Sequence, residues 1–287
     1  MIIIYEKPGR LANSLWLYAH FIAFAVEHNV SLAFPAMEDY GSYFRSLENS
    51  LLYRYPEKKS FVSSSFLRML IVKCLSFFAY VILKTGLSPG LMELLQIKNN
   101  VDFNLEDEEN LSQLKKKLVL VKGWLYRSNT LIVKHRATVL SFFRPMEKYE
   151  KNVLELIEKC RKDCEILIGM HIRREDYKTF LDGIYYYEME DYKSKMLELN
   201  KLFVDKRVTF LICSNEIMNP TDFSGINIVM ANDHIIEDMY SLAKCDLIVG
   251  PPSTYSMWAS FYGNVPLYQI KKIKKPIALK DFEVTIN

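Results

Sequence analysis

The stretch EILIGMHIRREDY, residues 165–177, decides the fold class of this 287-residue chain. Residues 165–172 form a mostly apolar run of the length of a buried strand, and Arg173 and Arg174 follow it directly. In open α/β sheets, ligands bind beyond the carboxyl ends of the parallel strands. The stretch therefore predicts an α/β fold with a binding site where this strand ends.

Strands and helices alternate on both sides of this stretch, which is typical of α/β proteins. Before it, the pattern predicts strands over 2–5, 30–34 and 118–121 and helices over 11–28, 129–143 and 146–163. After it, the pattern predicts helices over 187–199, 235–244 and 255–261 and strands over 208–213, 226–230, 246–249 and 265–270. Pro145 ends a helix, and we place a domain boundary there. We expect two Rossmann-like domains, residues 1–145 and 146–287, that face a central cleft.

The charge of the chain is nearly balanced, with 37 basic and 34 acidic side chains and a formal net charge of +3. This balance excludes wholesale nucleic-acid binding by electrostatics, so any anion site must be local. The five cysteines lack the paired spacing of a zinc site, and we expect reduced thiols and no bound metal.

One segment complicates an entirely soluble interpretation: FLRMLIVKCLSFFAYVIL, residues 66–83, is strongly apolar but contains Arg68 and Lys73. Because a charge at the centre of a membrane span is costly, we favour a core or interdomain helix over an interfacial helix, and both over a span. The first residues are typical of a strand and not of a signal peptide, so we expect a cytoplasmic protein, with membrane association left open.

Four lysines near the C-terminus favour a solvated edge, with contact to an anionic membrane surface as the alternative: Lys271, Lys272, Lys274 and Lys275.

Charged and aromatic side chains follow the strand that ends at Ile172. Two adjacent guanidinium groups, Arg173 and Arg174, can neutralise a diphosphate as its bond to a sugar breaks. Asp176 is either an orienter of these arginines, which we favour, or a general base for an attacking hydroxyl. His171 is equally compatible with a structural hydrogen bond and with a role in substrate binding or catalysis.

Two further loops are expected at the carboxyl ends of strands. The first begins a helix, where free N–H donors and hydroxyls suit a phosphate, although simple N-capping is the alternative; its residues are Ser253, Thr254 and Ser256. The second follows the first strand and allows close backbone approach to a ligand; its residues are Gly9, Arg10 and Asn13.

Taken together, these residues resemble the fucosyltransferase superfamily, specifically the α-1,2-fucosyltransferase-like enzymes with their His-x-Arg-Arg-x-Asp-Tyr motif. The motif stands here as HIRREDY, residues 171–177. The sequence GRLAN, residues 9–13, and CDLIVGPPSTYSMW, residues 245–258, are also similar to that family.

The resemblance implies a two-domain GT-B fold, GDP-fucose as donor substrate, inversion at the fucose anomeric carbon and no cofactor or obligatory metal. In that family the arginine matching Arg174 grips the donor diphosphate, with Arg173 beside it. We expect Arg173, Arg174 and Asp176 to act in catalysis, residues 146–287 to bind the nucleotide sugar and residues 1–145 to bind a glycan acceptor. Three alternatives stay open: a non-catalytic nucleotide- or glycan-binding module, a transferase for another nucleotide sugar, and a membrane-anchored transferase.

Overall fold

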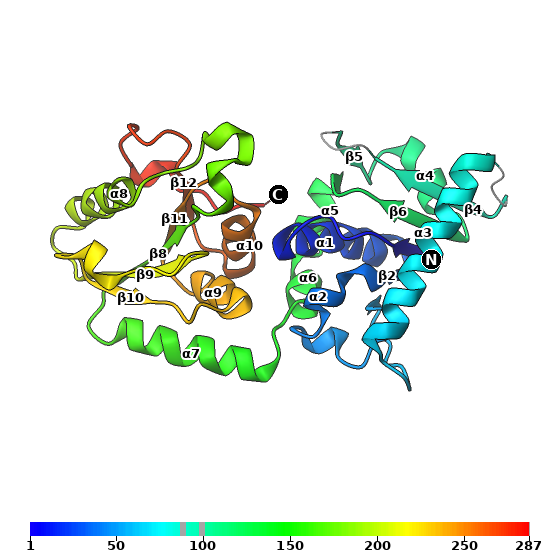
Figure 1. Cartoon of the computed structure of the whole chain (residues 1–287), viewed down its shortest axis with the longest axis horizontal. Helices are drawn as coiled ribbons and strands as arrows, with labels where there is room; N and C mark the ends of the chain where they lie inside the picture. The colour runs from blue at the N-terminus through cyan, green and yellow to red at the C-terminus, as the bar shows by residue number, and fades with distance from the viewer. Residues whose placement is uncertain (87–89, 98–100, 287) are drawn as a thin grey trace. The chain divides into compact units, whose positions relative to one another are not determined.

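The computed structural model describes residues 1–86, 90–97 and 101–286, and it divides the chain into two compact units, Met1–Met146 and Glu147–Asn287 (Figure 1). Each unit is built on a five-stranded sheet with helices packed on it. The predicted α/β class with parallel sheets is confirmed. The two units meet in sequence one residue after the boundary predicted at residue 145.

The sheet of the first unit has the strand order β3-β2-β1-β6-β4. Its strands are parallel except the edge strand β3, and their bounds are β1 Ile2–Ile4, β2 Leu32–Ala33, β3 Arg54–Tyr55, β4 Met92–Gln96 and β6 Leu118–Lys122. A parallel pair, β5 Phe103–Asn104 and β7 Tyr126–Arg127, forms a second small sheet. The helices are α1 Leu11–His28, α2 Glu38–Gly41, α3 Ser65–Thr85, α4 Glu108–Leu114, α5 Asn129–Lys134 and α6 Arg136–Phe142.

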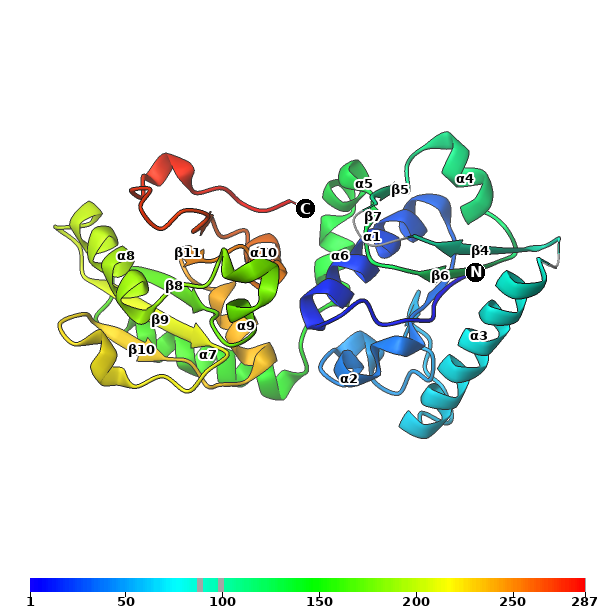
Figure 2. The same cartoon turned by 45° about the horizontal axis from the view of Figure 1, so that its top comes forward.

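Helix α1 is the crossover between β1 and β2, and nearly every residue from Leu11 to Ala25 is buried. It is covered because α5, α6 and β7 pack against it. Helix α3 lies on the sheet at Ile3 and Leu120, through a smaller cluster that includes Ala79 (Figure 2).

The sheet of the second unit is entirely parallel, with the order β10-β9-β8-β11-β12. The strand bounds are β8 Ile166–Ile172, β9 Val208–Ser214, β10 Ile228–Met230, β11 Leu247–Gly250 and β12 Leu267–Gln269, and the helices are α7 Glu147–Arg161, α8 Met189–Leu202, α9 Ile235–Leu242 and α10 Thr254–Gly263. The central strand β8 is apolar except for His171, as expected of a strand that sheet neighbours and helices bury on both faces. It pairs with β9 along its whole length, from Ile166 opposite Val208 to Ile172 opposite Ser214.

Short 3-10 helices connect these elements, with bounds Pro35–Met37, Arg45–Leu47, Asp176–Lys178, Phe180–Gly183, Pro220–Phe223 and Leu279–Asp281.

The structure corrects the prediction for residues 66–83. They form α3. This helix is largely exposed and is not a core helix, because the rest of the first unit covers only its inner side, at Arg68, Ala79 and Ile82. By length and composition alone, Ser65–Thr85 could cross a membrane.

One smaller prediction is also wrong. The helix expected over 129–143 is two helices that meet at His135, whose backbone leaves the helical region while its Nε2 lies 2.7 Å from a carboxylate oxygen of Glu27.

Candidate functional site

The strand order of the second unit creates a switch point beside β8. From β8 the chain passes to β9 and β10 on one side, and it then returns to β11 and β12 on the other side. The loops that leave β8 and β11 therefore diverge, and such a divergence opens the crevice in which open α/β sheets bind ligands. Arg173 stands at the end of β8, and Ser253 stands just beyond the end of β11.

Arg173 bridges these two loops. Its Nη1 donates to the Ser253 hydroxyl at 2.9 Å, and its guanidinium carbon lies 4.6 Å from the centre of the Tyr177 ring. Burial acts against the charged form, but the hydrogen bond to Asp176 and the neighbouring Tyr177 outweigh it and raise the pKa of Arg173. The result is a permanently charged, positioned cation at the switch point.

Asp176 holds Arg173 with both carboxylate oxygens. Arg173 Nε donates to Oδ1 at 3.1 Å, and Nη2 donates to Oδ2 at 2.7 Å. Such a bidentate pair fixes the plane of the guanidinium. This geometry agrees with the orienting role that we favoured, because both oxygens are engaged by the arginine.

Arg174 points to a different set of partners. Its Nη2 donates to the hydroxyl of Tyr186 at 2.7 Å and to Glu188 at 3.0 Å, while Nη1 lies 3.8 Å from Glu216, just beyond the end of β9. Its Nε is buried and has no hydrogen-bond partner in the part of the chain that the structure describes. The two arginine side chains therefore contact opposite sides of β8, and their binding of one diphosphate stays a prediction.

His171 is the last but one residue of β8, and it is buried. Burial, with a smaller contribution from Arg173, lowers its pKa to about 3, so the imidazole is neutral at physiological pH. Its Nδ1 has no hydrogen-bond partner among the described residues, and the ring lies 5.1 Å from the ring of Tyr255. Unpaired buried polar atoms such as this one and Arg174 Nε are uncommon, and a water molecule, an ion or a ligand can supply the partner.

The residues that begin α10 differ in their roles. Ser253 is the N-cap, because its hydroxyl accepts from the N–H of Tyr255 at 3.3 Å, and it also accepts from Arg173. Ser256 is fully buried and donates back to the Ser253 carbonyl at 3.1 Å. Thr254 is half-buried at the first position of the helix. Ser253 therefore both caps α10 and contacts Arg173, whereas the Ser256 hydroxyl is hydrogen-bonded to the backbone of the first turn of α10.

Two further residues connect the loops of the site: Asn215, which was not predicted as a site residue, and Tyr177, which ends the predicted motif but was given no role of its own. Asn215, after β9, accepts from the backbone N–H of Arg174 at 3.2 Å, and its amide lies 3.4 Å from Asp176. Tyr177 donates its hydroxyl hydrogen to the Pro252 carbonyl at 2.5 Å, which ties the β8 loop to the β11 loop. The position of Asn215 at the same sheet edge is the signal that could have found it.

Gly9, Arg10 and Asn13 belong to the first unit, where they form the turn between β1 and α1. Gly9 has a φ of +91°, which favours glycine, and a Cβ there would lie 3.1 Å from the Asn13 amide nitrogen. Arg10 is exposed and occupies the N-cap position of α1. The turn follows the carboxyl end of β1, as predicted, and its role in binding stays a prediction.

A cavity of about 570 Å³ opens at the same edge of the first unit. Its walls come from the segments that follow β1 and β2 and from one side of α3, with Tyr5, Glu6, Pro35, Glu38, Asp39 and Met69 among the lining residues. It offers carboxylates on one side and an apolar wall on the other.

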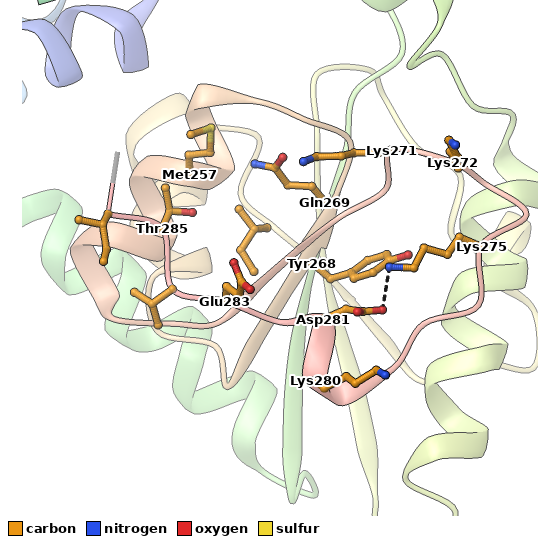
Figure 3. A pocket seen from close by; sticks show the side chains of 13 residues that line it. Met257, Tyr268, Gln269, Lys271, Lys272, Lys275, Lys280, Asp281, Glu283 and Thr285 are labelled. Atoms are coloured by element: carbon orange, nitrogen blue, oxygen red, sulfur yellow. Dashed lines mark ion pairs between the residues drawn. The ribbon is translucent and has the colours of Figure 1, made fainter. Parts of the chain in front are cut away.

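A second cavity, of about 810 Å³, lies in the second unit beyond β12. Lysines from the C-terminal segment line it, including Lys271, Lys272 and Lys280, and Lys275 pairs with Asp281 at 2.9 Å (Figure 3). It begins beside the Ser253 loop, because Gln269 is the register partner of Gly250. Three of the four C-terminal lysines thus line a cavity and are not merely a solvated edge.

Among residues 1–86, 90–97 and 101–286, no group of three or more histidine, cysteine or acidic side chains could hold a metal ion. All five cysteines are free thiols.

No family model and no curated protein sequence matches the chain. Solved structures do. A mutant of FUT1 from Arabidopsis thaliana in complex with GDP is 13% identical, with a TM-score of 0.60 over 93% of this chain and 70% of that chain. The fucosyltransferase NodZ from Bradyrhizobium is 11% identical, with a TM-score of 0.57 over 94% of each chain. POFUT1 in complex with GDP is 11% identical, with a TM-score of 0.58 over 93% of this chain and 97% of that chain. At these identities the likeness shows the fold, which is that of these two-domain fucosyltransferases.

Proposed function

We propose that the protein is an inverting glycosyltransferase that transfers L-fucose from GDP-fucose to a hydroxyl of a glycan acceptor. The observation that carries this proposal is the Arg173 guanidinium, held by Asp176 and Ser253 at the switch point of the second sheet. The HIRREDY motif and the likeness to structures described as fucosyltransferases with GDP support it.

The reaction needs a cation where the nucleotide leaves. The acceptor oxygen bonds to the anomeric carbon of fucose on the face opposite GDP, the bond from that carbon to the diphosphate oxygen breaks, and the electron pair leaves with GDP. The proton of the acceptor hydroxyl passes to solvent or to the departing diphosphate. Negative charge builds on the diphosphate, and a preorganised guanidinium stabilises it without reorganisation. Arg173 is such a group, because its contacts hold it in place before any ligand arrives.

Arg174 has a second role in this scheme. Its charge is now shared with Glu188 and Glu216, and its buried Nε–H lacks a partner among the described residues. A nucleotide oxygen that accepted from this group would satisfy it. We therefore assign Arg173 to the departing diphosphate and Arg174 to binding of the donor.

The acceptor is assigned to the first unit. The cavity at the ends of β1 and β2 combines carboxylates, which accept hydrogen bonds from sugar hydroxyls, with an apolar wall on α3. For the linkage, the motif favours α-1,2 transfer, whereas NodZ, with the same fold, is described as an α-1,6-fucosyltransferase. The fold therefore does not determine the linkage, which has to be identified by analysing the reaction product.

The test compares two arginine variants with a matched control. Arg173→Ala should weaken GDP binding by one to two orders of magnitude, since a charge-assisted hydrogen bond contributes about 1.5–3 kcal/mol, and it should lower the transfer rate by at least about 100-fold. Arg174→Ala should abolish transfer. Arg207→Ala is the control, because Arg207 is exposed and precedes β9, at the opposite edge of the sheet.

GDP binding is measured by calorimetry, and transfer is measured with GDP-fucose and a panel of glycans whose products are analysed for linkage. Wild-type GDP affinity and transfer rate in Arg173→Ala would contradict the proposal. Tight GDP binding by the wild type without turnover on any donor or acceptor would instead identify a non-catalytic binding module.

A further inference from the structure

Helix α3 has an inner face that packs on the sheet and an outer face that nothing in the described structure covers. Ala79 and Ile82 are buried on the inner side. Phe66 and Met69, near its start, line the cavity at the ends of β1 and β2. The outer face of α3 is defined here by residues three or four positions apart along the rest of the helix: Leu70, Lys73, Phe77, Tyr80 and Lys84. Phe77 and Tyr80 are 68% and 56% exposed. This face is therefore an apolar, aromatic stripe in contact with solvent.

Such an outer face is unusual for a helix that covers a sheet. A surface helix normally turns charged residues outward, as α7 does with Lys151, Glu155 and Lys159. Helices that are apolar all round are normally buried, as α1 is. Only α3 combines an apolar outer side with exposure among the longer helices of the described chain, and large exposed apolar patches mark interaction sites.

The charges in the chain segment that contains this stripe have one sign, whereas the carboxylates of Glu6, Glu38 and Asp39 lie at the cavity beside the first turns of α3. Between Glu57 and Glu93 the sequence contains no acidic residue. Four lysines of this stretch are exposed: Lys58, Lys59, Lys73 and Lys84. The surface that α3 presents is thus complementary to a partner that is both apolar and negatively charged.

The first turns of α3 are fixed to the protein. Arg68 is buried and pairs with Glu38, and its Nη1 donates to the Ser50 carbonyl at 3.2 Å. Crossing a bilayer would bring this pair into hydrocarbon and would strip α3 from Ile3 and Leu120. The helix is therefore suited to lie along a surface and not to span a membrane.

We propose that α3 docks the protein on the surface of a membrane that contains anionic phospholipids. In this arrangement the aromatic and aliphatic side chains of the outer face enter the boundary between headgroups and acyl chains, and Lys73 and Lys84 extend to lipid phosphates. Burial of the apolar stripe in the membrane provides binding free energy, and the lysines provide selectivity for anionic lipids. This inference does not depend on the proposed enzymatic activity.

The experiment is sedimentation of the full chain with sucrose-loaded vesicles, made either of phosphatidylcholine alone or of phosphatidylcholine with phosphatidylglycerol. The wild type should sediment with the mixed vesicles and much less with phosphatidylcholine alone. Lys73→Gln together with Lys84→Gln should weaken the partition about 30-fold, because each lysine at an anionic surface contributes about a fivefold factor. Phe77→Ser together with Tyr80→Ser should also lose binding.

Matched controls change the same residue types on the second unit. Lys159 and Lys162 are exposed at the end of α7 and after it, and their double change to glutamine should leave sedimentation unaltered. Leu154→Ser and Val204→Ser remove exposed apolar side chains that lie outside α3, and they should also behave as wild type. Circular dichroism and thermal unfolding verify that each variant is folded.

Three results would overturn the proposal. The wild type could stay in the supernatant with both vesicle types. The α3 variants, although folded, could sediment as well as the wild type. Light scattering could show a dimer that ignores vesicles and that Phe77→Ser converts to a monomer, in which case the stripe is an interface between two copies of the chain.

Discussion

Replacing the buried carboxyl of Asp238 by an amide should stabilise the second unit, and the gain should grow with pH. Asp238 lies on α9 and is only 5% exposed. Burial raises its pKa to about 7, with Asp233 and Glu237 adding to the increase and backbone N–H groups of His234 and Asn232 opposing it. In Asp238→Asn the side chain keeps its size and cannot ionise.

The magnitude follows from the difference between the folded and unfolded pKa values. With a folded pKa of about 7 against 3.8, the unfolded chain loses its proton first, so the wild type loses stability as the pH rises from about 4 to 7. At 1.36 kcal/mol per pKa unit, the loss is about 2 kcal/mol at pH 5 and about 4 kcal/mol at pH 8. Asp238→Asn lacks this loss, so its advantage over the wild type should double between these two pH values.

His171 changes stability in the opposite direction. Its folded pKa is about 3, against 6.5 for an unperturbed histidine, so the unfolded chain binds the proton first and stability falls as the pH drops below about 6.5. This loss reaches about 2 kcal/mol at pH 5. Because His171 is present in both proteins, its effect cancels in the difference between the variant and the wild type.

The assay is denaturant unfolding of the full chain at pH 5 and pH 8, followed by hydrogen exchange of peptides from β8 and β9, which report the second unit separately. An equal difference between variant and wild type at both pH values would refute the assignment of a raised pKa to Asp238. A destabilised variant at pH 8 would show that the carboxylate is stabilised there and not penalised by burial.

Two further perturbations test how each unit is held together. Gly250→Ala would place a Cβ 2.7 Å from the carbonyl oxygen of His171 and 2.9 Å from the Cβ of His171, so strands β8 and β11 must separate. We expect a loss of about 1–3 kcal/mol in the free energy of unfolding and weaker GDP binding in calorimetry. Gly90→Ala, which meets nothing within 4 Å, is its control and should be close to neutral. Arg68→Met leaves Glu38 without its buried partner and should cost about 3 kcal/mol in denaturant unfolding of the first unit, whereas Arg68→Met together with Glu38→Gln should recover part of that loss.

Elements with local signals were predicted well from the sequence. The helix predicted over 11–28 is α1, because a glycine turn precedes it and Asn29, in the left-handed region, ends it. The strand predicted over 165–172 is β8, starting one residue later. Both signals lie in the segments themselves, so no knowledge of the rest of the chain was needed.

The side-chain partners of the two adjacent arginines could not be predicted from the sequence. Arg173 meets Ser253 because β11 returns beside β8, and Arg174 meets Glu216 because β9 occupies the other side. Strand order is set by the packing of the whole sheet and not by the residues around the motif. The placement of the two guanidinium groups on opposite sides of β8 therefore required the topology, and their binding of one diphosphate stays a prediction.

The same limit explains why α1 and α3 were difficult to distinguish. Both are long and apolar, but the cover of α1 comes from residues 126–142, more than a hundred positions after it starts, whereas α3 receives no such cover in the described chain. Hydropathy indicates that an apolar surface must cover such a helix, but it does not indicate whether that surface belongs to protein or to lipid. The sign of the nearby charges does carry this information: Lys7 precedes α1 and Glu27 lies in its last turn, whereas the region of α3 contains only cations from Lys58 to Lys84. An apolar helix whose neighbouring charges are all positive is therefore the pattern that predicts binding to an anionic surface. The vesicle experiment tests whether that inference holds for this chain.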